Sequence, residues 1–394
     1  MEEILTASGI FLTSCYMAFV IFLYSGLGRL GKLRGPGFQP ENDPPQAEKT
    51  VSVVVAARNE ERMIAALLDA LLGQDYPSDK FDIIIVNDRS EDGTRTIIDS
   101  YRENDARITC IDISDVPDGH SPKKYALTAG IGAAQGKIIC TTDADCIPPP
   151  GWISALVGYF DDETGMVAGY SPLVVKDGSA IFAKYLAIDA LSLAAASAGG
   201  LGWGVGLTCA GRNLAYRKSV FEEVGGFEDV KEQISGDDDL LMHLVQSKTG
   251  WKVRYATDRN AVVPSIVQPG ISRYFNQRTR HASKFRIYPF RVQAVSMMIF
   301  LFYLAIGTYP LYMLITGAFL SVYAVMLAGK ALVEYPAIRR GSRLLGADST
   351  AERQQFGTGT FLFAFFVHPL LIVLFSILGT RGRFTWKGRE FGKG

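Results

Sequence analysis

Residues 137–148 read KIICTTDADCIP and decide the fold. The first four residues form an apolar run typical of a buried strand, and Asp143 and Asp145 follow where that strand should end. Open α/β sheets bind ligands at the carboxyl ends of their strands. Two carboxylates separated by one residue can reach a hard divalent cation, which prefers oxygen ligands and can also hold a diphosphate. An Asp-x-Asp pair alone more often marks a solvated loop, so the rest of the chain must support the site.

Strands and helices alternate upstream of this stretch. β-branched and apolar runs predict strands over residues 51–57, 81–86 and 108–113. Amphipathic segments between them predict helices over residues 64–72 and 94–101. Such alternation is typical of a mainly parallel, doubly wound α/β sheet, in which strand ends gather at one edge.

A helix over residues 121–135 is predicted to lead into the Asp-x-Asp strand. Ser121 is its expected N-cap and Pro122 its first residue, so Lys123 and Lys124 would lie in the first turn. Free backbone N–H groups at such a turn attract phosphate. The sequence therefore predicts a phosphate-facing turn next to the strand that ends in carboxylates.

Two later segments add candidate features. The glycine-rich residues 199–211 suggest a mobile loop over a ligand. Residues 235–240 read SGDDDL and predict the start of a helix with Ser235 as its cap, which would put Asp237 in the first turn. Acidic residues in a first helical turn are favoured by the helix dipole.

Composition excludes some classes of partner. The 394 residues include 40 Lys and Arg and 40 Asp and Glu, so no net charge indicates binding to nucleic acid. The five cysteines form no CxxC pair. They are typical of the reduced, mostly packed thiols of a cytoplasmic domain.

The N-terminal segment is predicted to anchor the chain in a membrane. Residues 10–27 are almost free of charge and about long enough to cross a bilayer as a helix. Basic residues follow this run and acidic ones precede it, so the positive-inside rule places the N-terminus outside and the next domain in the cytoplasm. A cleaved signal peptide would carry its basic residues first. We therefore expect an anchor over residues 1–34, a linker over residues 35–49 and a cytoplasmic domain over residues 50–270.

The C-terminal third is predicted to return to the membrane. Residues 271–291 combine basic and aromatic side chains and suggest an amphipathic helix on the membrane surface. Residues 292–394 would form a transmembrane region, with two helices hinged near residues 307–310 and a third over residues 359–379.

The orientation of the C-terminal tail stays open. A loop that carries Arg339, Arg340 and Arg343 should be cytoplasmic. Three crossings would then put the tail outside, whereas its own basic residues favour the inside. One re-entrant segment would resolve the conflict.

Five motifs between residues 50 and 285 resemble, in the same order, those of the family 2 glycosyltransferases, membrane-attached enzymes with a GT-A nucleotide-sugar domain. They are Ala57, Asn59 and Glu60 in AARNE, Asp88 in NDRSEDGT, Lys123 in PKKYAL, Asp143 and Asp145 in DAD, and Asp237 in SGDDD. A sixth motif, QRTRH at residues 277–281, resembles the family's Gln-x-x-Arg-Trp motif. Each motif has a structural alternative, such as a turn aspartate or a surface lysine, but the ordered set favours an enzyme.

Three positions depart from the family pattern. Pro122 stands where the family has glycine, and Gly236 where it has the glutamate that precedes the catalytic aspartate. His281 replaces the tryptophan that processive members place near the acceptor sugar. The last departure disfavours polysaccharide synthesis and favours the addition of a single sugar.

The resemblance implies an inverting, metal-dependent transfer of a sugar from a nucleoside diphosphate sugar, with UDP-sugar expected, to a membrane lipid or lipid-linked acceptor. Mg²⁺ or Mn²⁺ would lie on Asp143 and Asp145, and Asp237 would be the general base. Donor contacts are expected from Ala57, Asn59, Glu60, Asp88, Lys123 and Asp143. Residues expected to face the acceptor or the diphosphate are Asp238, Asp239, Gln277, Arg278, Arg280 and His281. The enzyme would be an integral protein of the bacterial inner membrane with its catalytic domain in the cytoplasm.

Several alternatives remain at this point. The C-terminal hydrophobic segments could help to form the channel of a processive polysaccharide synthase. Pro122 and Gly236 could mark a non-catalytic, membrane-tethered module that binds sugar nucleotides. A sugar nucleotidyltransferase shares the sheet but requires neither the membrane region nor Asp237. Arg278 and Arg280 could contact lipid head groups. The sequence predicts no oligomeric state.

Overall fold

The computed structural model describes residues 2–33, 49–175, 180–267, 270–317, 320–347, 357–381, 384–386 and 389–391. The predicted linker over residues 35–49 lies, apart from Lys49, outside the described residues. Much of the basic C-terminal tail, including Arg383 and Lys387, lies outside them as well.

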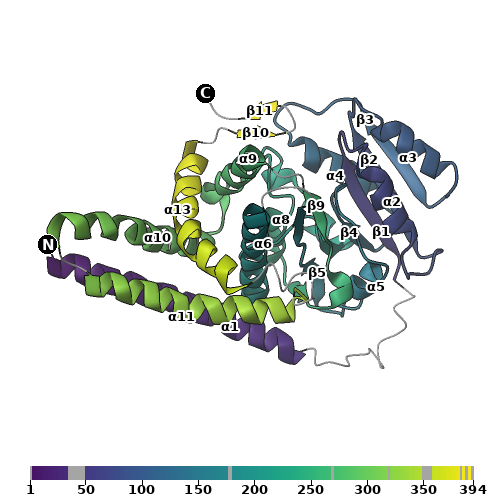
Figure 1. The fold of residues 1–394 in the computed structure, drawn as a ribbon. Coiled ribbons are helices and arrows are strands. Elements are labelled where there is room, and N and C mark those ends of the chain that lie inside the picture. The colour runs from purple at the N-terminus through teal and green to yellow at the C-terminus, as the bar shows by residue number, and fades with distance from the viewer. Residues whose placement is uncertain are drawn as a thin grey trace.

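A seven-stranded sheet organises the chain (Figure 1). Its order is β3-β2-β1-β4-β7-β5-β8, and all neighbouring pairs are parallel except those that involve β7. The strands are β1 Val51–Ala57, β2 Phe81–Asp88, β3 Ile108–Ile113, β4 Ile138–Thr141, β5 Thr164–Gly169, β7 Leu214–Arg217 and β8 Lys252–Ala256. A parallel pair, β6 Leu173–Val175 with β9 Ser265–Val267, and an antiparallel pair, β10 Phe384–Trp386 with β11 Arg389–Phe391, lie outside this sheet. The mainly parallel sheet that the sequence predicted is confirmed.

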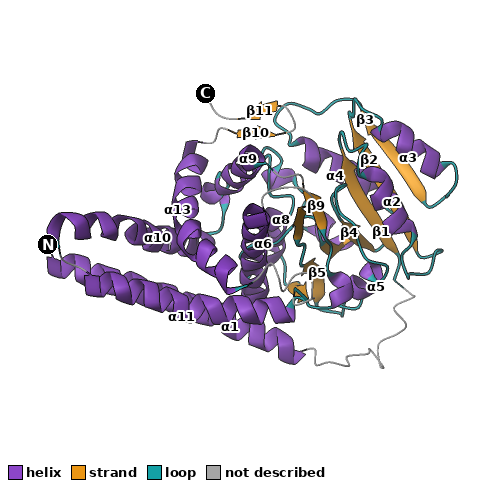
Figure 2. Ribbon diagram, in the orientation of Figure 1, coloured by secondary structure: helices purple, strands orange, loops and turns teal. Residues whose placement is uncertain are grey.

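Helices cover both faces of the sheet (Figure 2). Successive strand residues point to opposite sides, so Val53 and Val55 of β1 belong to one core and Val54 between them belongs to the other. The first face carries α2 Ile64–Leu72, α3 Thr94–Arg102 and α5 Trp152–Val157. The second carries α4 Pro122–Ala133, α6 Ala180–Leu201, α7 Lys218–Glu223 and α8 Asp239–Lys248. Short 3-10 helices occur at Glu228–Val230, Arg259–Ala261 and Phe285–Ile287.

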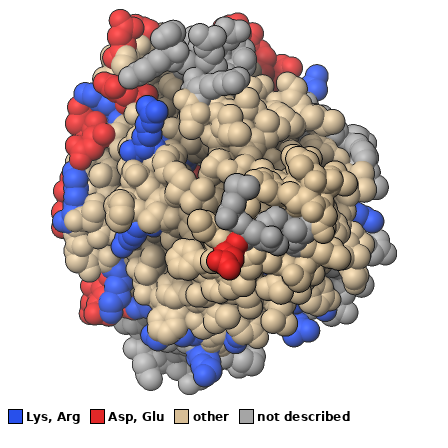
Figure 3. Space-filling view, turned by 90° about the vertical axis from the view of Figure 1, so that its left-hand side faces the viewer, with Lys and Arg blue, Asp and Glu red and all other residues tan. Residues whose placement is uncertain are grey.

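Long apolar helices form a second region beside the sheet. Helices α1 Glu2–Leu33, α10 Phe290–Thr316 and α11 Leu320–Leu344 lie side by side and extend away from the sheet, with the N-terminus at the far tip (Figure 1). Helix α13 Thr358–Arg381 lies between this bundle and the sheet, where it packs on α6, α10 and α9 Ile271–Ala282. Viewed from the tip, most of the coloured surface is uncharged, with one acidic group near its middle, and the Lys, Arg and other Asp and Glu side chains lie mainly toward the edges (Figure 3).

Within the described residues, four helices are long and apolar enough to cross a membrane: α1, α6, α10 and α13. Helix α6 differs from the other three because half of its apolar window is buried, against the sheet on one side and α1 on the other. The four helices together fit an association of the chain with a membrane.

A buried polar cluster joins the helices of the bundle. Lys330 of α11 donates to Glu334 at 2.7 Å and to the carbonyl oxygen of Phe365 in α13 at 3.1 Å. Glu334 also accepts hydrogen bonds from Tyr16 of α1 and Tyr303 of α10. Since unpaired charges are costly in an apolar setting, these contacts fix α1, α10, α11 and α13 relative to one another.

Glycines bring α1 and α6 into backbone contact. A Cβ atom on Gly26 would stand 1.9 Å from the carbonyl oxygen of Gly199, and one on Gly202 would stand 2.2 Å from that of Gly26. The prediction of a mobile loop over residues 199–211 is therefore wrong at its start, because residues 199–201 belong to α6 and their glycines serve helix packing.

Three predictions for the C-terminal third are wrong in detail. Helix α10 runs unbroken through residues 307–310, and the chain turns only at Gly317, whose φ of 67° favours glycine. Arg339, Arg340 and Arg343 lie in the last turns of α11 rather than in a loop. The helix expected over residues 271–291 ends at Ala282, and its Lys284 is buried instead of facing a membrane surface.

Candidate active site

The carboxyl ends of β1, β2 and β4 form one edge of the sheet, which we call the donor edge. Ala57 ends β1 and is buried, and Asn59 and Arg89 follow β1 and β2 with φ of 53° each. Positive φ is uncommon for residues other than glycine and often occurs at functional sites. Asn59 Oδ1 accepts from the Glu91 backbone N–H at 2.8 Å, and the Glu60 backbone N–H donates to Thr94 Oγ1 at 2.7 Å. These bonds join the loops after β1 and β2 into one structure.

Asp88 lies at the end of β2, as predicted, and is 3% exposed. Its Oδ1 accepts from Arg89 Nε at 2.8 Å, and Arg58 Nη1 lies 3.9 Å from its other oxygen. Two guanidinium groups therefore compensate the charge of this buried carboxylate at the donor edge.

Lys123 joins the Asp-x-Asp segment to the candidate base. Its Nζ lies 2.7 Å from Asp143 Oδ1 and 2.8 Å from Asp237 Oδ2, and it projects from the first turn of α4 as predicted. Burial alone would lower the pKa of Lys123, but the charges of Asp143 and Asp237 raise it above its ordinary value. The ammonium group is thus charged and bridges two carboxylates that lie far apart in the sequence.

Asp145 is a largely buried carboxylate next to a second carboxylate, Asp143. Burial raises the pKa of its carboxyl, the negative charge of Asp143 adds to this shift, and Arg212 opposes it. Within the described residues, no group of three or more His, Cys, Asp or Glu side chains could hold a metal ion by themselves. Two carboxylates fit a Mg²⁺-type ion, which usually takes one or two protein carboxylates and completes its shell with phosphate and water.

Asp237 lies in a turn, residues 233–239, that we call the base turn. The prediction that Ser235 caps a helix is wrong: α8 begins at Asp239, and Asp238 is its N-cap, with a side chain that accepts from the Asp239 backbone N–H at 2.7 Å. Asp237 therefore precedes the helix. Gly236 before it has a φ of 91°, and a Cβ there would stand 2.5 Å from Leu240 Cδ1. This backbone conformation gives a physical reason for glycine where the family has glutamate.

Lys124 stabilises the base turn through hydrogen bonds to backbone carbonyl groups. Its side chain is 2% exposed, and its Nζ donates to the carbonyl oxygens of Val230, Gln233 and Ser235 at 2.7, 2.8 and 3.0 Å. Burial lowers the pKa of Lys124 to about 8, although the charge of Asp237 acts against this shift. Lys124, which follows Lys123 in the sequence, thus supports the backbone that carries the candidate base.

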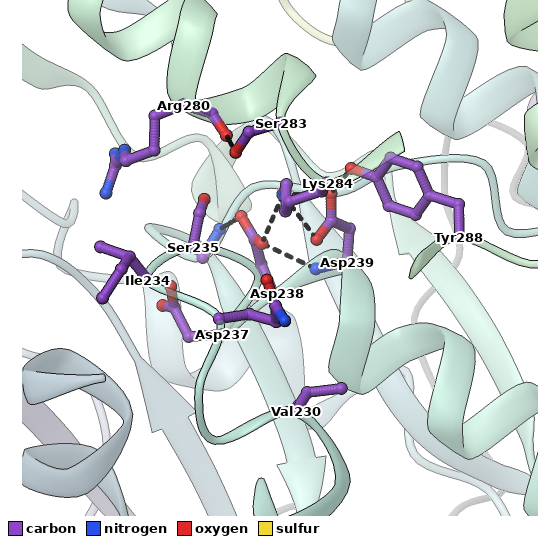
Figure 4. A network of polar contacts seen from close by, with 12 residues as sticks. Val230, Ile234, Ser235, Asp237, Asp238, Asp239, Arg280, Ser283, Lys284 and Tyr288 are labelled. Atoms are coloured by element: carbon purple, nitrogen blue, oxygen red, sulfur yellow. Dashed lines mark hydrogen bonds and ion pairs between the residues drawn. The ribbon is translucent and has the colours of Figure 1, made fainter. Parts of the chain in front are cut away.

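Asp239 is engaged in a buried ion pair. Lys284 Nζ lies 2.8 and 2.6 Å from its two oxygens, and Tyr288 donates to it at 2.5 Å. The side chains of Lys284 and Asp239 are only 3% and 4% exposed. Figure 4 shows Lys284 and Tyr288 converging on Asp239 while Asp237 points away from them.

Asp238 is also held by the protein, because its Oδ2 accepts a hydrogen bond from the Gly211 backbone N–H at 3.0 Å. These contacts make both aspartates part of the framework around the base turn.

Helix α9 is fastened to α6 through a second buried cluster. Arg278 forms an ion pair with Asp189 of α6, and Tyr274 donates to the same carboxylate at 3.4 Å. Asp189 is 2% exposed, so this pair sets the position of α9 rather than a surface contact.

Gln277, Arg280 and His281 of α9 line the same cavity as Asp143 and Asp237. Burial lowers the pKa of Arg280, whereas the charges of the carboxylates of Asp237, Asp238 and Asp143 act against that shift. Burial also lowers the pKa of His281 well below its usual range, and neighbouring cations add to the effect. The imidazole is therefore neutral.

The cavity has a volume of about 150 Å³, and its walls are chemically different. One wall carries the charged groups, and the other is formed by Leu193, Ala194 and Ser197 of α6. Sequence analysis did not identify Arg212, which also lines the cavity and interacts with Asp145. Its place directly after the glycine-rich residues 199–211 was the available signal. The role of α6 could not be inferred, because it depends on packing.

Comparison with known proteins agrees with this architecture. Residues 52–225 match the family model described as Glycosyl transferase family 2. The probable glycosyltransferase YdaM of Bacillus subtilis is 31% identical over 208 residues, which cover 52% of this chain and 48% of that protein. The beta-monoglucosyldiacylglycerol synthase of Synechocystis is 26% identical over 280 residues, 67% of this chain and 55% of that protein. The chain thus spans about half the length of these curated relatives.

A solved structure shares nearly the whole fold. The mannosyltransferase PcManGT from Pyrobaculum calidifontis, in complex with GDP-Man and Mn²⁺, matches with a TM-score of 0.53 and 19% identity over 95% of this chain and 96% of its own. The likeness therefore includes the long helices as well as the sheet. Residues 52–225 are thus similar to glycosyl transferase family 2, and the fold of the chain is GT-A-like.

Proposed function

We propose that the protein transfers a sugar from a nucleoside diphosphate sugar to a hydroxyl group of a membrane-associated lipid acceptor, with inversion at the anomeric carbon. The observation that carries this proposal is the bridge from Asp143 through Lys123 to Asp237, with 2.7 and 2.8 Å contacts. Within one cavity it joins the first turn of α4, which would face a phosphate, the carboxylate of Asp143, which would bind a cation, and the candidate base Asp237.

The donor edge would bind the nucleoside. Asp88 offers a carboxylate at the end of β2, beside the end of β1, where Ala57 is the last strand residue and Asn59 and Glu60 follow. A UDP-sugar is the expected donor. The diphosphate would lie toward Lys123 and the first turn of α4, where backbone N–H groups favour negative charge.

Asp143 and Asp145 would hold Mg²⁺ or Mn²⁺, which would supply charge neutralisation for the leaving diphosphate. The carboxylate pair supports this assignment through the burial and mutual repulsion that raise the pKa of Asp145. The archaeal mannosyltransferase of similar fold was determined with Mn²⁺ and GDP-Man.

Asp237 would act as the general base. It would accept the proton of the acceptor hydroxyl while that oxygen attacks the anomeric carbon and the bond from this carbon to the diphosphate oxygen breaks. Lys123, which donates to Asp237 at 2.8 Å, would shift its hydrogen bond to the diphosphate and so free the base. Arg280 would add positive charge on the side of α9.

A lipid acceptor is supported by the surroundings of the cavity. One wall includes Leu193 and Ala194 of α6, a helix that also packs on α1 and α13. The cyanobacterial relative is named for the synthesis of a glucosyl diacylglycerol. We place the catalytic domain on the cytoplasmic side, because Arg29 and Lys32 end α1 on the side of the sheet.

The proposal is tested by incubating the purified protein in lipid nanodiscs with a panel of nucleotide sugars. One donor should release its nucleotide only when Mg²⁺ or Mn²⁺ is present and should label a lipid that partitions into organic solvent. A product that remains in the aqueous phase as a long polymer would support a processive synthase instead. Absence of release with every donor would support a binding module.

A further inference from the structure

A second cavity, of about 680 Å³, lies where the ends of α1, α6 and α10 meet α8 and the edge strand β8. It shares only Tyr255 with the lining of the active-site cavity. None of the residues assigned to the donor, the base or the acceptor lines it. The second cavity therefore has no part in the proposed sugar transfer, and its role must be a different one.

Two arginines from different helices face this cavity. The guanidinium of Arg29 in α1 lies 4.1 Å from the centre of the Trp203 ring. Arg291 Nη2 in α10 donates to Gln246 Oε1 at 2.8 Å, and the same oxygen accepts from the Gly206 backbone N–H at 3.0 Å. Both arginines are therefore held in place by neutral groups.

The charge of this cavity is positive. Asp161, an acidic residue of its lining, is engaged by Arg254 at 2.6 Å. In the part of the chain that the structure describes, no carboxylate lies within ion-pair distance of Arg29 or Arg291, and both side chains are exposed. Two guanidinium groups with free donors in one cavity are suited to an oxygen-rich anion such as a phosphate.

The position of the arginines along their helices sets the depth of the cavity. Helices α1 and α10 have 32 and 27 residues, so they are roughly 48 and 40 Å long, whereas the hydrocarbon core of a bilayer is about 30 Å thick. Their remote ends meet at the tip of the bundle (Figure 1), and Arg29 and Arg291 lie near the opposite ends. If the bundle spans the membrane, both arginines fall in the head-group layer beyond the hydrocarbon.

Trp203 supports this depth independently. It is 42% exposed, and its Nε1 donates to the Phe22 carbonyl oxygen and to Ser25 Oγ at 3.1 Å each. Tryptophan side chains with an anchored N–H and an exposed ring are typical of membrane interfaces. The ring and Arg29 together therefore mark the same layer.

We propose that this cavity binds the phosphate head group of an anionic membrane phospholipid, with Arg29 and Arg291 as its ligands. The site rests on the membrane insertion in the proposed function but not on sugar transfer. Its occupant connects the end of α1 to the start of α10, two residues after Tyr288 of the framework around the base turn. Anionic lipid therefore stabilises the junction between the membrane helices and the catalytic domain.

The test compares wild type with Arg29→Gln/Arg291→Gln in phosphatidylcholine nanodiscs, with or without phosphatidylglycerol and without any donor. The matched control is Lys80→Gln/Arg102→Gln, which removes two positive charges near the β2 and β3 side of the sheet, away from β8. Phosphatidylglycerol should raise the melting temperature of the wild type and of the control. The Arg29→Gln/Arg291→Gln variant should bind phosphatidylglycerol at least about tenfold more weakly than the wild type does. Arg29→Lys/Arg291→Lys should retain part of the response.

Two further measurements distinguish a lipid site from a folding defect and from a site for free phosphate. Unchanged nucleotide release by Arg29→Gln/Arg291→Gln in phosphatidylcholine shows that the variant is folded and that transfer is independent of the site. A wild-type response to phosphatidylglycerol in that variant would overturn the proposal. Equal stabilisation by inorganic phosphate, lost in the same variant, would also overturn it, because the site would then bind free phosphate rather than lipid.

Discussion

Asp88 is the last residue of β2 and Asp143 follows β4, and these two strands flank β1 in the sheet. Asp237, by contrast, lies in a turn held by residues from distant parts of the chain. The donor edge needs only parallel strands of matched length, because their carboxyl ends then meet. The base turn needs Lys124 from α4, Lys284 from beyond α9 and Gly211 from the segment after α6. The proposed donor binding and the proposed proton transfer thus depend on different parts of the fold.

Substitutions at the donor edge and near the base turn should therefore disturb different parts of the structure. A change at the donor edge alters loops that bond mainly to each other, such as those of Asn59 and Glu91. A change near the base turn reaches α9 and α10, since Lys284 and Tyr288 connect Asp239 to the start of the bundle. Four substitutions, ordered by expected effect, can break or sharpen this contrast.

Asp237→Asn should have the largest effect. It removes the proton acceptor but keeps an oxygen that can accept the hydrogen bond of Lys123. Sugar transfer should fall by about 10²–10⁴-fold, the usual contribution of general base catalysis, while donor affinity by calorimetry stays close to that of wild type. Transfer at the wild-type rate would exclude Asp237 as the base.

Lys284→Met should leave the charge of Asp239 buried without its ion pair. Breaking a buried pair in this way costs about 3–5 kcal/mol, which thermal unfolding in detergent would detect. Lys284→Met/Asp239→Leu removes both charges and should recover most of the loss. A double variant as unstable as the single one would show that the ion pair is not the source of the effect.

Gly236→Ala and Gly225→Ala form a matched pair. Both glycines have positive φ, at 91° and 79°, so each alanine should cost about 1–2 kcal/mol of stability. A Cβ at position 225 meets nothing within 4 Å, whereas one at position 236 meets Leu240 next to the base. Only Gly236→Ala should therefore lower kcat as well. Equal kcat values for the two variants would contradict a role of Gly236 in positioning Asp237.

Asn59→Ala should have the smallest effect and act on the donor alone. It removes the 2.8 Å bond to the Glu91 backbone N–H at a position where asparagine tolerates positive φ better than alanine. A loss of about 1 kcal/mol predicts a roughly fivefold higher KM for the donor, with the acceptor KM unchanged. Asn104→Ala, at the end of α3, is the control and should change neither constant.

The donor edge and the sheet could be predicted from the sequence because their signals are local. A β-branched run, a Pro-started helix and carboxylates at strand ends each lie within a short window, and β1, α4 and β4 formed where expected. Lys123 and Asp237 were also identified, and the structure brings them within 2.8 Å of each other.

The surroundings of the base could not be predicted in the same way. Ser235 satisfies a capping pattern, yet the positive φ of Gly236 delays the helix until Asp239, and only Asp238 then caps it. Lys284 looked like one of several basic residues for a membrane surface, but its partner lies 45 positions earlier in the chain. Long-range pairing of this kind leaves no periodic signal in the sequence.

The contact of Gly26 with Gly199 and Gly202 shows that α1 packs on the catalytic domain, in addition to its proposed role as an anchor. A helix that only tethers a domain could be cut away, and the domain would remain soluble and active. Here the same cut would uncover the face of α6 that packs on α1, and residues on another side of α6 form a wall of the candidate active-site cavity. Expression of the catalytic domain alone is therefore expected to give an aggregating protein, and any usable preparation has to retain α1 and be handled in detergent or lipid.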